Sequence, residues 1–479
     1  MRALILIHRW LGVVFCLFFA MWFATGSVMH FVPFPELREA ERVAGLAPID
    51  AANIRHGPAA AYTASGINDA TRVRLQARAD GLVYVVQGAA GMRAVHAGDL
   101  SPAAVRSENL ALTIALDHAR QRGIDATSAR FSELANHDQW TVPNALDPHR
   151  PLYRITLNDE RGTELYVSSA TGEVVRDTTR RERGWNYAGS VAHWIYPTVL
   201  RRNWRAWDAL VWTLSLCALI TAIAGALLGV SRLNAARGRL VSPYRGWHAW
   251  HHWLGLVCLT FVLTWIFSGW LSMDHGRLFS TGKPAATEAA NFASDTAWEK
   301  LSAREISPLS AHVREIEWFA FDGRTFRRER RGLTVQHLSH ADDTAAAEIP
   351  GRAYLRADEA TAAAGRLAAD CLPAVAVHVN DDYPVVSVMP DAPVYRSVCG
   401  DVWFHFDGAS GAMLEKLDTS RRAYRWAYAA LHTLDFPFLT ARPLLRTTLI
   451  VTLCGLGLAF SVTAMVIAWR RLRGPAQAR

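Results

Sequence analysis

The sequence contains four long runs that carry no charged side chain, at 11–29, 209–230, 253–273 and 447–469. A helix rises about 1.5 Å per residue, so about 20 apolar residues cross the roughly 30 Å hydrocarbon layer of a membrane. Inside lipid the backbone polar groups must be paired within the segment, which makes each run a helix. The sequence therefore predicts four transmembrane helices and excludes a purely water-soluble protein.

Arginine residues mark one side of the predicted membrane segment. The short connection between the second and third runs contains four arginines, and no acidic residue lies between 230 and 253. By the positive-inside rule, this connection and both termini face the cytoplasm, and the two long polar segments lie on the far side. The other basic residues are scattered, so the net charge of +8 does not indicate nucleic-acid binding.

These boundaries divide the chain into membrane helices, far-side domains and one loop. The helices are predicted at 4–30, 204–230, 247–273 and 445–470. The domains are predicted at 31–203 and 274–444, and the cytoplasmic loop at 231–246. The lipid bilayer is therefore an obligatory partner of the chain.

Both far-side domains show patterns of mixed secondary structure. The first has a helical pattern at 110–122 and strand patterns at 153–157, 164–167 and 173–175. The second has a helical pattern at 357–367 and strand patterns at 385–388, 402–406 and 413–416. We expect each domain to be a helix packed on a small antiparallel sheet, which makes the fold class α+β.

The six cysteines fall into two groups. Four lie one in each apolar run and are expected to pack as small apolar residues. Cys371 and Cys399 lie in the second far-side domain, and in an oxidising compartment such a pair is expected to form a disulfide. The sequence has no CxxC or CxxCH spacing that would indicate zinc, an iron–sulfur cluster or covalent haem.

The two halves of the chain repeat the same motifs. Residues 8–12 read His-Arg-Trp-Leu-Gly, and residues 251–255 read His-His-Trp-Leu-Gly, a shift of 243 positions. His193 recurs as His432 at a shift of 239 positions. Matches in the same order at nearly equal shifts predict an internal duplication of a unit made of helix, domain and helix. Because both copies run in the same direction, a pseudo-two-fold axis along the membrane normal is expected.

Histidines gather at the ends of the predicted membrane helices. An ionisable residue at membrane depth is a functional candidate by default. The repeat places His8 opposite His251 in the alignment of the two halves, and His193 opposite His432, while His30 and His275 are nearly equivalent. The candidate residues are His8, His30, His193, His248, His251, His252, His275 and His432.

Paired histidines between apolar helices favour haem b as the ligand. Zinc usually takes a tetrahedral set that includes Cys or carboxylate, and a proton relay would need acidic residues that the four runs lack. Haem b needs two axial imidazoles, an apolar slot and cations near its propionates. The runs supply Trp, Phe, Leu and Gly, and arginines flank them. We therefore expect two haem b groups.

Two ligation schemes remain open. In the first, His8 and His251 hold one haem near the cytoplasm, and far-side histidines hold the second. In the second, both haems lie at the far-side boundary, held by His30, His193, His275 and His432. His8 and His30 are 22 residues apart, or roughly 33 Å along a helix, which is long for direct electron transfer and weakens the first scheme.

The sequence resembles the PepSY-associated transmembrane family. The resemblance rests on the motif at 8–12, on Thr25-Gly26, on Thr-Gly-Glu-Val-Val at 171–175 and on Ala192-His193. It covers nearly the whole chain in two copies. The sequence departs from the family in placing Ala before His193 and Trp after it, whereas Leu-His-Thr at 431–433 keeps the usual form.

The resemblance implies a bacterial inner-membrane protein of iron–siderophore uptake, with periplasmic PepSY-like domains and two b-type haems. It implies that the protein passes electrons to a periplasmic ferric siderophore, and the histidines named above would bind haem iron. No C-terminal reductase domain is found in the sequence, so the electron donor is expected to be a separate protein or a membrane quinol.

Two other functions are compatible with the sequence. PepSY domains resemble propeptide inhibitors, so a non-enzymatic membrane protein that inhibits or regulates a periplasmic partner is the main alternative; it predicts no haem. A siderophore permease is the other, and the expected absence of broken membrane helices argues against it.

Overall fold

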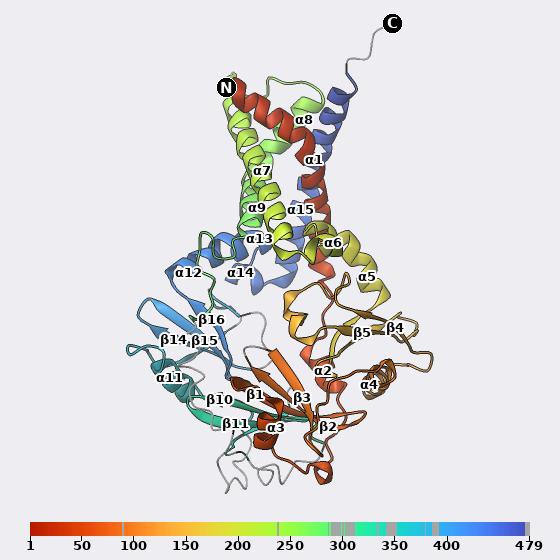
Figure 1. Ribbon diagram of the computed structural model, residues 1–479. Coiled ribbons are helices and arrows are strands. Elements are labelled where there is room, and N and C mark those ends of the chain that lie inside the picture. The colour runs from red at the N-terminus through yellow and green to blue at the C-terminus, as the bar shows by residue number, and fades with distance from the viewer. Residues whose placement is uncertain are drawn as a thin grey trace.

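The computed structural model describes residues 1–88, 91–236, 239–285, 287–288, 298, 301, 312–332, 335–341, 352–378, 380–385 and 392–474. Long apolar helices form a bundle at one end of the molecule, and three antiparallel sheets lie at the other (Figure 1). The start of the first helix and the end of the last lie at the end of the bundle away from these sheets (Figure 1). The predicted mixture of membrane helices and antiparallel sheets is confirmed.

The bundle consists of helices α1 (Arg2–Phe31), α7 (Trp204–Ser231), α8 (Trp247–Val257), α9 (Leu259–Leu271) and α15 (Pro443–Leu472). Three of them, α1, α7 and α15, are each long and apolar enough to cross a membrane. A fourth crossing is made if α8 and α9 form one span. The connection between α7 and α8 contains the short strands β8 (Asn234–Ala236) and β9 (Arg239–Val241).

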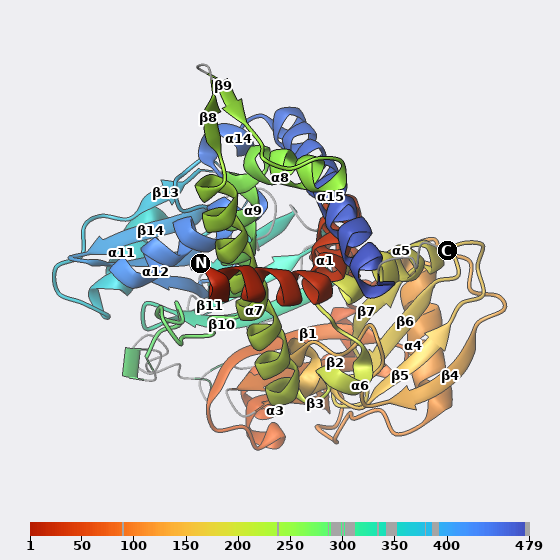
Figure 2. The ribbon, with the colours of Figure 1, turned by 90° about the horizontal axis from the view of Figure 1, so that it is seen from above.

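The predicted third span is bent rather than straight. Helices α8 and α9 meet at an angle of 70° at Cys258, so the expectation that no membrane helix is broken is wrong. Hydropathy records how apolar a segment is and not the direction of its axis, and no proline marks the bend. In Figure 2, α8 and the first turns of α1 lie across the top of the bundle.

Two separate four-stranded antiparallel sheets correspond to the predicted sheets. The first unit contains α4 (Glu108–Gln121), β4 (Arg130–Ala135), β5 (Leu152–Thr156), β6 (Glu164–Ser168) and β7 (Val174–Thr178). The second contains α11 (Ala357–Gly365), β13 (Val375–Val377), β14 (Val394–Cys399), β15 (Val402–Asp407) and β16 (Met413–Leu417). Both units have the same order of elements, and Figure 2 shows them on opposite sides of the bundle. In the predicted strand at 385–388, residues 386–388 lie outside the described residues.

A six-stranded antiparallel sheet that was not predicted from the sequence joins the two long polar segments. Its strand order is β12-β11-β10-β1-β2-β3, so strands from both halves of the chain pair at its centre. The strands are β1 (Ala70–Arg78), β2 (Gly81–Gly88), β3 (Gly91–His96), β10 (Glu315–Phe321), β11 (Arg324–Arg330) and β12 (Gln336–His340). The two polar segments therefore share a sheet instead of folding as two independent layers.

The two faces of the six-stranded sheet differ in chemistry because successive side chains on a strand point to opposite faces. One face is apolar along β1 and β10, where it buries Leu75, Ile316 and Trp318. On the other face, alternate residues of β1, β10 and β11 are charged, and most of them are buried. They are Arg72, Arg74, Glu315, Glu317, Arg328 and Arg330.

Short elements connect these parts. They are α2 (Glu39–Ala44), η1 (Ala51–Asn53), α3 (Pro58–Ser65), η2 (Asn144–His149), α5 (Arg180–Asn186), η3 (Tyr187–Val191), α6 (Thr198–Arg201), α12 (Thr419–Arg425), η6 (Trp426–Ala430), α13 (Leu431–Thr433) and α14 (Pro437–Thr440). A disulfide joins Cys371 to Cys399 and ties the segment after α11 to the end of β14.

Candidate functional site

His8 and His251 face each other inside the helix bundle. His8 lies on α1 and His251 on α8, and their ring centroids are 6.3 Å apart with the planes tilted by 35°. Both rings are partly buried. Two imidazoles at this separation can coordinate one metal centre from opposite sides.

His193 and His432 form a second pair, near the end of the bundle that adjoins the sheets. Their ring centroids are also 6.3 Å apart, and the ring planes are inclined by 66°. The indole of Trp22 donates a hydrogen bond of 3.0 Å to the carbonyl oxygen of His193 and so ties this segment to α1. Residue 25, which contacts the His193 ring, lies 17 residues beyond His8, so the two pairs are about 25 Å apart along α1.

In all four histidines, Nδ1 contacts an oxygen of a neighbouring helix. The contacts are His8 with the carbonyl oxygen of Thr221 (3.2 Å), His251 with Thr463 Oγ1 (3.0 Å), His193 with Thr25 Oγ1 (2.9 Å) and His432 with Ser268 Oγ (3.1 Å). Metal-bound histidines characteristically engage their second nitrogen in this way, which fixes the ring and its tautomer. This arrangement leaves Nε2 of each ring available for another contact.

A cavity of about 550 Å³ surrounds the first pair. Its lining is mostly apolar, and Arg9, Arg232 and Arg471 contribute cationic groups. Gly225 on α7 makes room for His8, because a Cβ atom at this glycine would lie 2.6 Å from His8 Cε1. The volume is within the range of about 300–1,000 Å³ typical of small-molecule and cofactor sites.

The remaining candidate histidines make other contacts. His30 Nε2 lies 2.9 Å from Thr447 Oγ1, and His275 Nδ1 lies 3.2 Å from Asp208 Oδ1, so each links two segments at the boundary of the bundle. Both nitrogens of His252 are occupied, by Ser242 Oγ and the Gly229 carbonyl oxygen. His248 lines the 550 Å³ cavity but is exposed. Over the described ranges, no group of three or more His, Cys, Asp or Glu side chains could hold a metal ion.

A π-helical turn precedes each histidine of the second pair, a feature that the sequence analysis missed. His193 comes two residues after η3, and His432 comes two residues after η6. Such turns often lie at functional sites because the wider turn redirects the following side chains. The signal for these turns in the sequence is an aromatic residue followed by Ala, at 187–188 and again at 426–427.

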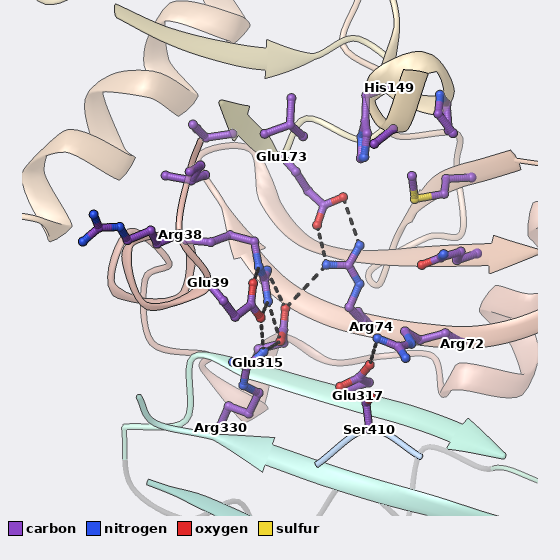
Figure 3. A pocket seen from close by; sticks show the side chains of 18 of the residues that line it. Arg38, Glu39, Arg72, Arg74, His149, Glu173, Glu315, Glu317, Arg330 and Ser410 are labelled. Atoms are coloured by element: carbon purple, nitrogen blue, oxygen red, sulfur yellow. Dashed lines mark hydrogen bonds and ion pairs between the residues drawn. The ribbon is translucent and has the colours of Figure 1, made fainter. Parts of the chain in front are cut away.

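A second, charged cavity lies among the three sheets outside the bundle (Figure 3). Its volume is about 990 Å³, and its walls come from the charged face of the six-stranded sheet, α2, η2, the start of β7 and the turn from β15 to β16. Arginine–glutamate pairs dominate the lining. Glu315 accepts hydrogen bonds from Arg42 (2.7 and 2.9 Å) and Arg330 (2.9 Å), and Arg74 lies 2.7 Å from Glu173.

The buried carboxylates of this network have lowered pKa values. Burial alone would raise the pKa of Glu315, but Arg42 and Arg330 hold it well below its usual value. Burial opposes ionisation of Glu39 in the same way, and Arg42 nevertheless lowers its pKa to about 2. In contrast, burial lowers the pKa of His118, which packs beside this network, to about 3.

We expect the stability of the region outside the bundle to fall in two stages on acidification. Unfolded histidines take up protons below pH 6.5, whereas buried His118 stays neutral, so stability is lost as the pH falls from that value toward 3. Unfolded glutamates take up protons below pH 4.5, and the loss then steepens as the pH approaches 2. Urea midpoints of the full chain in detergent between pH 8 and 3 measure this, and midpoints that do not change would contradict it.

The helices and sheets define a membrane protein with two facing histidine pairs in its helix bundle and a mixed α and β region outside the bundle. The family model described as the PepSY-associated TM region matches residues 5–471. The chain belongs to the PepSY-associated transmembrane family. No curated protein and no solved structure matches it.

Proposed function

We propose that the protein is an inner-membrane haem b protein that passes electrons to a ferric siderophore in the periplasm. The observation that carries this proposal is the pair of facing imidazoles at each end of the bundle. A coordinated imidazole nitrogen lies about 2 Å from its metal, so the centroids of two opposed rings are expected about 6 Å apart. Both pairs are at 6.3 Å.

The first ligation scheme is therefore the one we propose, with His8 and His251 holding one haem and His193 and His432 holding the other. The arginines around the 550 Å³ cavity suit the propionates, and its apolar walls suit the ring. The separation of about 25 Å is shorter than the distance that weakened this scheme. Phe15, Phe19 and Phe23 are buried between the two levels on α1.

We further propose that the chain arose by duplication. On the six-stranded sheet Arg74 of β1 lies directly opposite Glu317 of β10, and these two residues are equivalent at the repeat shift of 243 positions. A two-fold axis that relates the halves would pass between them. The matching order of elements in the two four-stranded units and the π-helical turns before His193 and His432 support the same relation.

In this proposal, haem supplies one-electron transfer when bound, and the protein supplies position and environment. The hydroxyls of Thr25, Ser268 and Thr463 orient the rings. The apolar bundle excludes water from the ligand site. Fe(II) is held less tightly than Fe(III) by hard oxygen chelators, so reduction would release the iron. We propose a membrane quinol or a separate protein as the donor, with the termini in the cytoplasm and the sheets in the periplasm.

An absorption spectrum tests this function. We expect the protein purified from bacterial membranes to show two b-type haems per chain in a dithionite-reduced minus oxidised spectrum, because each histidine pair completes one axial ligand set. Addition of a ferric siderophore to the reduced protein should restore the oxidised spectrum.

A haem-free preparation from haem-replete cells would contradict the proposal. It would favour the alternative of a PepSY-type inhibitor or regulator, which requires no haem. A haem-containing protein that no ferric chelate reoxidises would retain the cofactor assignment and exclude the substrate.

A further inference from the structure

The charged cavity among the three sheets contains polar groups whose hydrogen-bonding capacity is not used. Arg328 on β11 is 3% exposed and lines the cavity, and its Nε and Nη1 have no hydrogen-bond partner. Nδ1 of His149, in η2 at the opposite wall, also has none. A buried polar atom without a partner destabilises the folded protein, so such groups call for a ligand or water.

Glu317 explains why Arg328 is left open. This carboxylate is shared by two cations, since Arg72 Nη1 lies 2.8 Å from Glu317 Oε1 and Arg328 contacts Glu317 Oε2. Arg42 and Arg330 each contact two carboxylates, Glu315 and Glu39. Arg74 lies 2.7 Å from Glu173, and only its Nε has no hydrogen-bond partner. Arg328 has two guanidinium nitrogens without a partner where Arg74 has one, so the wall near Arg328 has the most unused donors for an added oxygen acceptor.

The charge of the whole lining restricts what can enter. Arginines and carboxylates are present in equal number. The arginines are Arg38, Arg42, Arg72, Arg74, Arg328 and Arg330, and the carboxylates are Glu36, Glu39, Glu173, Glu315, Glu317 and Asp407. The carboxylates would repel a ligand with several negative charges, because the arginines do not outnumber them. Such a ligand would also lose its hydration on entering the cavity, which disfavours binding. A neutral ligand with oxygen acceptors meets neither obstacle.

The wall of the cavity also reaches the histidine pair at the membrane boundary. Leu146 of η2 lines the cavity and packs in one cluster with Trp140, Phe34 and Val191. Val191 lies two residues before His193. A molecule bound in the cavity would therefore be close, through packed side chains, to the part of the bundle that we propose to hold haem.

We propose that this cavity binds an oxygen-rich chelate of zero net charge, with Arg328 and His149 as its contacts. The inference rests on the proposed function and deepens it by locating the chelate and restricting its charge.

Gallium chelates test the site without any electron transfer, because Ga(III) resembles Fe(III) in size and charge but is not reduced here. Three singly charged hydroxamates make a neutral gallium complex, and three doubly charged catecholates make one of charge −3. We expect the full-length protein in detergent to bind a gallium trihydroxamate by calorimetry and to bind the tricatecholate at least about tenfold more weakly.

Single substitutions then locate the site. Arg328→Gln should weaken trihydroxamate binding about tenfold or more, since hydrogen bonds to a charged group are lost, and Glu317 stays paired with Arg72. His149→Ala is a second variant, expected to weaken binding severalfold, and it leaves the arginine network unchanged. Arg356→Gln is the matched control, because Arg356 is exposed and pairs with exposed Asp358.

Three results would overturn the inference: no binding of the gallium trihydroxamate, equal or tighter binding of the tricatecholate, or binding that neither Arg328→Gln nor His149→Ala weakens. None of these bears on haem content. A protein with two haems that fails here therefore refutes the location of the chelate and not the haem assignment, whereas loss of the haem spectrum refutes the proposed function itself.

Discussion

Replacing His432 with alanine should halve the haem content of the purified protein. His432 faces His193 at 6.3 Å, and a b-type haem has no covalent attachment to replace a missing axial ligand. Haem held by His8 and His251 should remain, since the two pairs are about 25 Å apart. The double variant His8→Ala/His432→Ala should contain no haem. Haem per chain, from the pyridine haemochrome spectrum, measures both effects.

His30→Ala and His275→Ala are the matched controls for this prediction. These residues contact Thr447 and Asp208 and do not belong to a facing histidine pair. Both variants are expected to retain two haems per chain. A loss of haem in them, together with full haem content in His8→Ala, would favour the scheme in which both haems lie at the far-side boundary.

Glu315→Gln should destabilise the region outside the bundle by about 3–5 kcal/mol, the usual cost of removing one partner from a buried ion pair. Glu315 is fully buried and accepts hydrogen bonds from Arg42 and Arg330. When the Glu315 charge is removed, Arg42 and Arg330 must share Glu39. Part of their positive charge is then uncompensated in a buried environment. The urea midpoint of the full chain in detergent, followed by tryptophan fluorescence, measures the change at pH 7.

Glu160→Gln provides the control for this change. Glu160 is exposed, so the same chemical change there should alter the free energy of unfolding by no more than about 0.5 kcal/mol. Equal midpoints for Glu315→Gln and the unmodified protein would show that the charge of Glu315 makes no net contribution to stability. The haem spectrum should be the same in both variants, because Glu315 lies outside the bundle.

Secondary structure with strong periodicity was predicted well from the sequence. The helix expected at 110–122 is α4, and the strands expected at 402–406 and 413–416 are β15 and β16, each within two residues. These segments are signalled by their own residues, since apolar positions recur at the period of a helix or a strand. The bend at Cys258 had no comparable signal, because every residue around it is apolar or small.

The six-stranded sheet escaped prediction for a different reason. Its charged face is buried, so β1 and β10 alternate apolar with charged residues as a solvent-exposed sheet would, and β11 has four charged residues in a row at 327–330. The residues of one strand do not specify a partner strand that lies more than 200 residues away, because the pairing depends on both strands. At the repeat shift, Arg72 and Arg74 of the first half correspond to Glu315 and Glu317 of the second. This change of charge is present in the sequence, but only the pairing of β1 with β10 shows that the opposite charges lie side by side.

The sequence by itself determined that the chain enters a membrane, which family it resembles and which histidines recur in both halves, because composition and repeated motifs are properties of the chain. Only the tertiary structure decided which of these histidines face each other. His8 and His251 are 243 positions apart and His193 and His432 are 239 apart, yet each pair meets at 6.3 Å, because helix packing brings the two halves together. Local residues cannot encode that distance, since it depends on side chains from several helices at once.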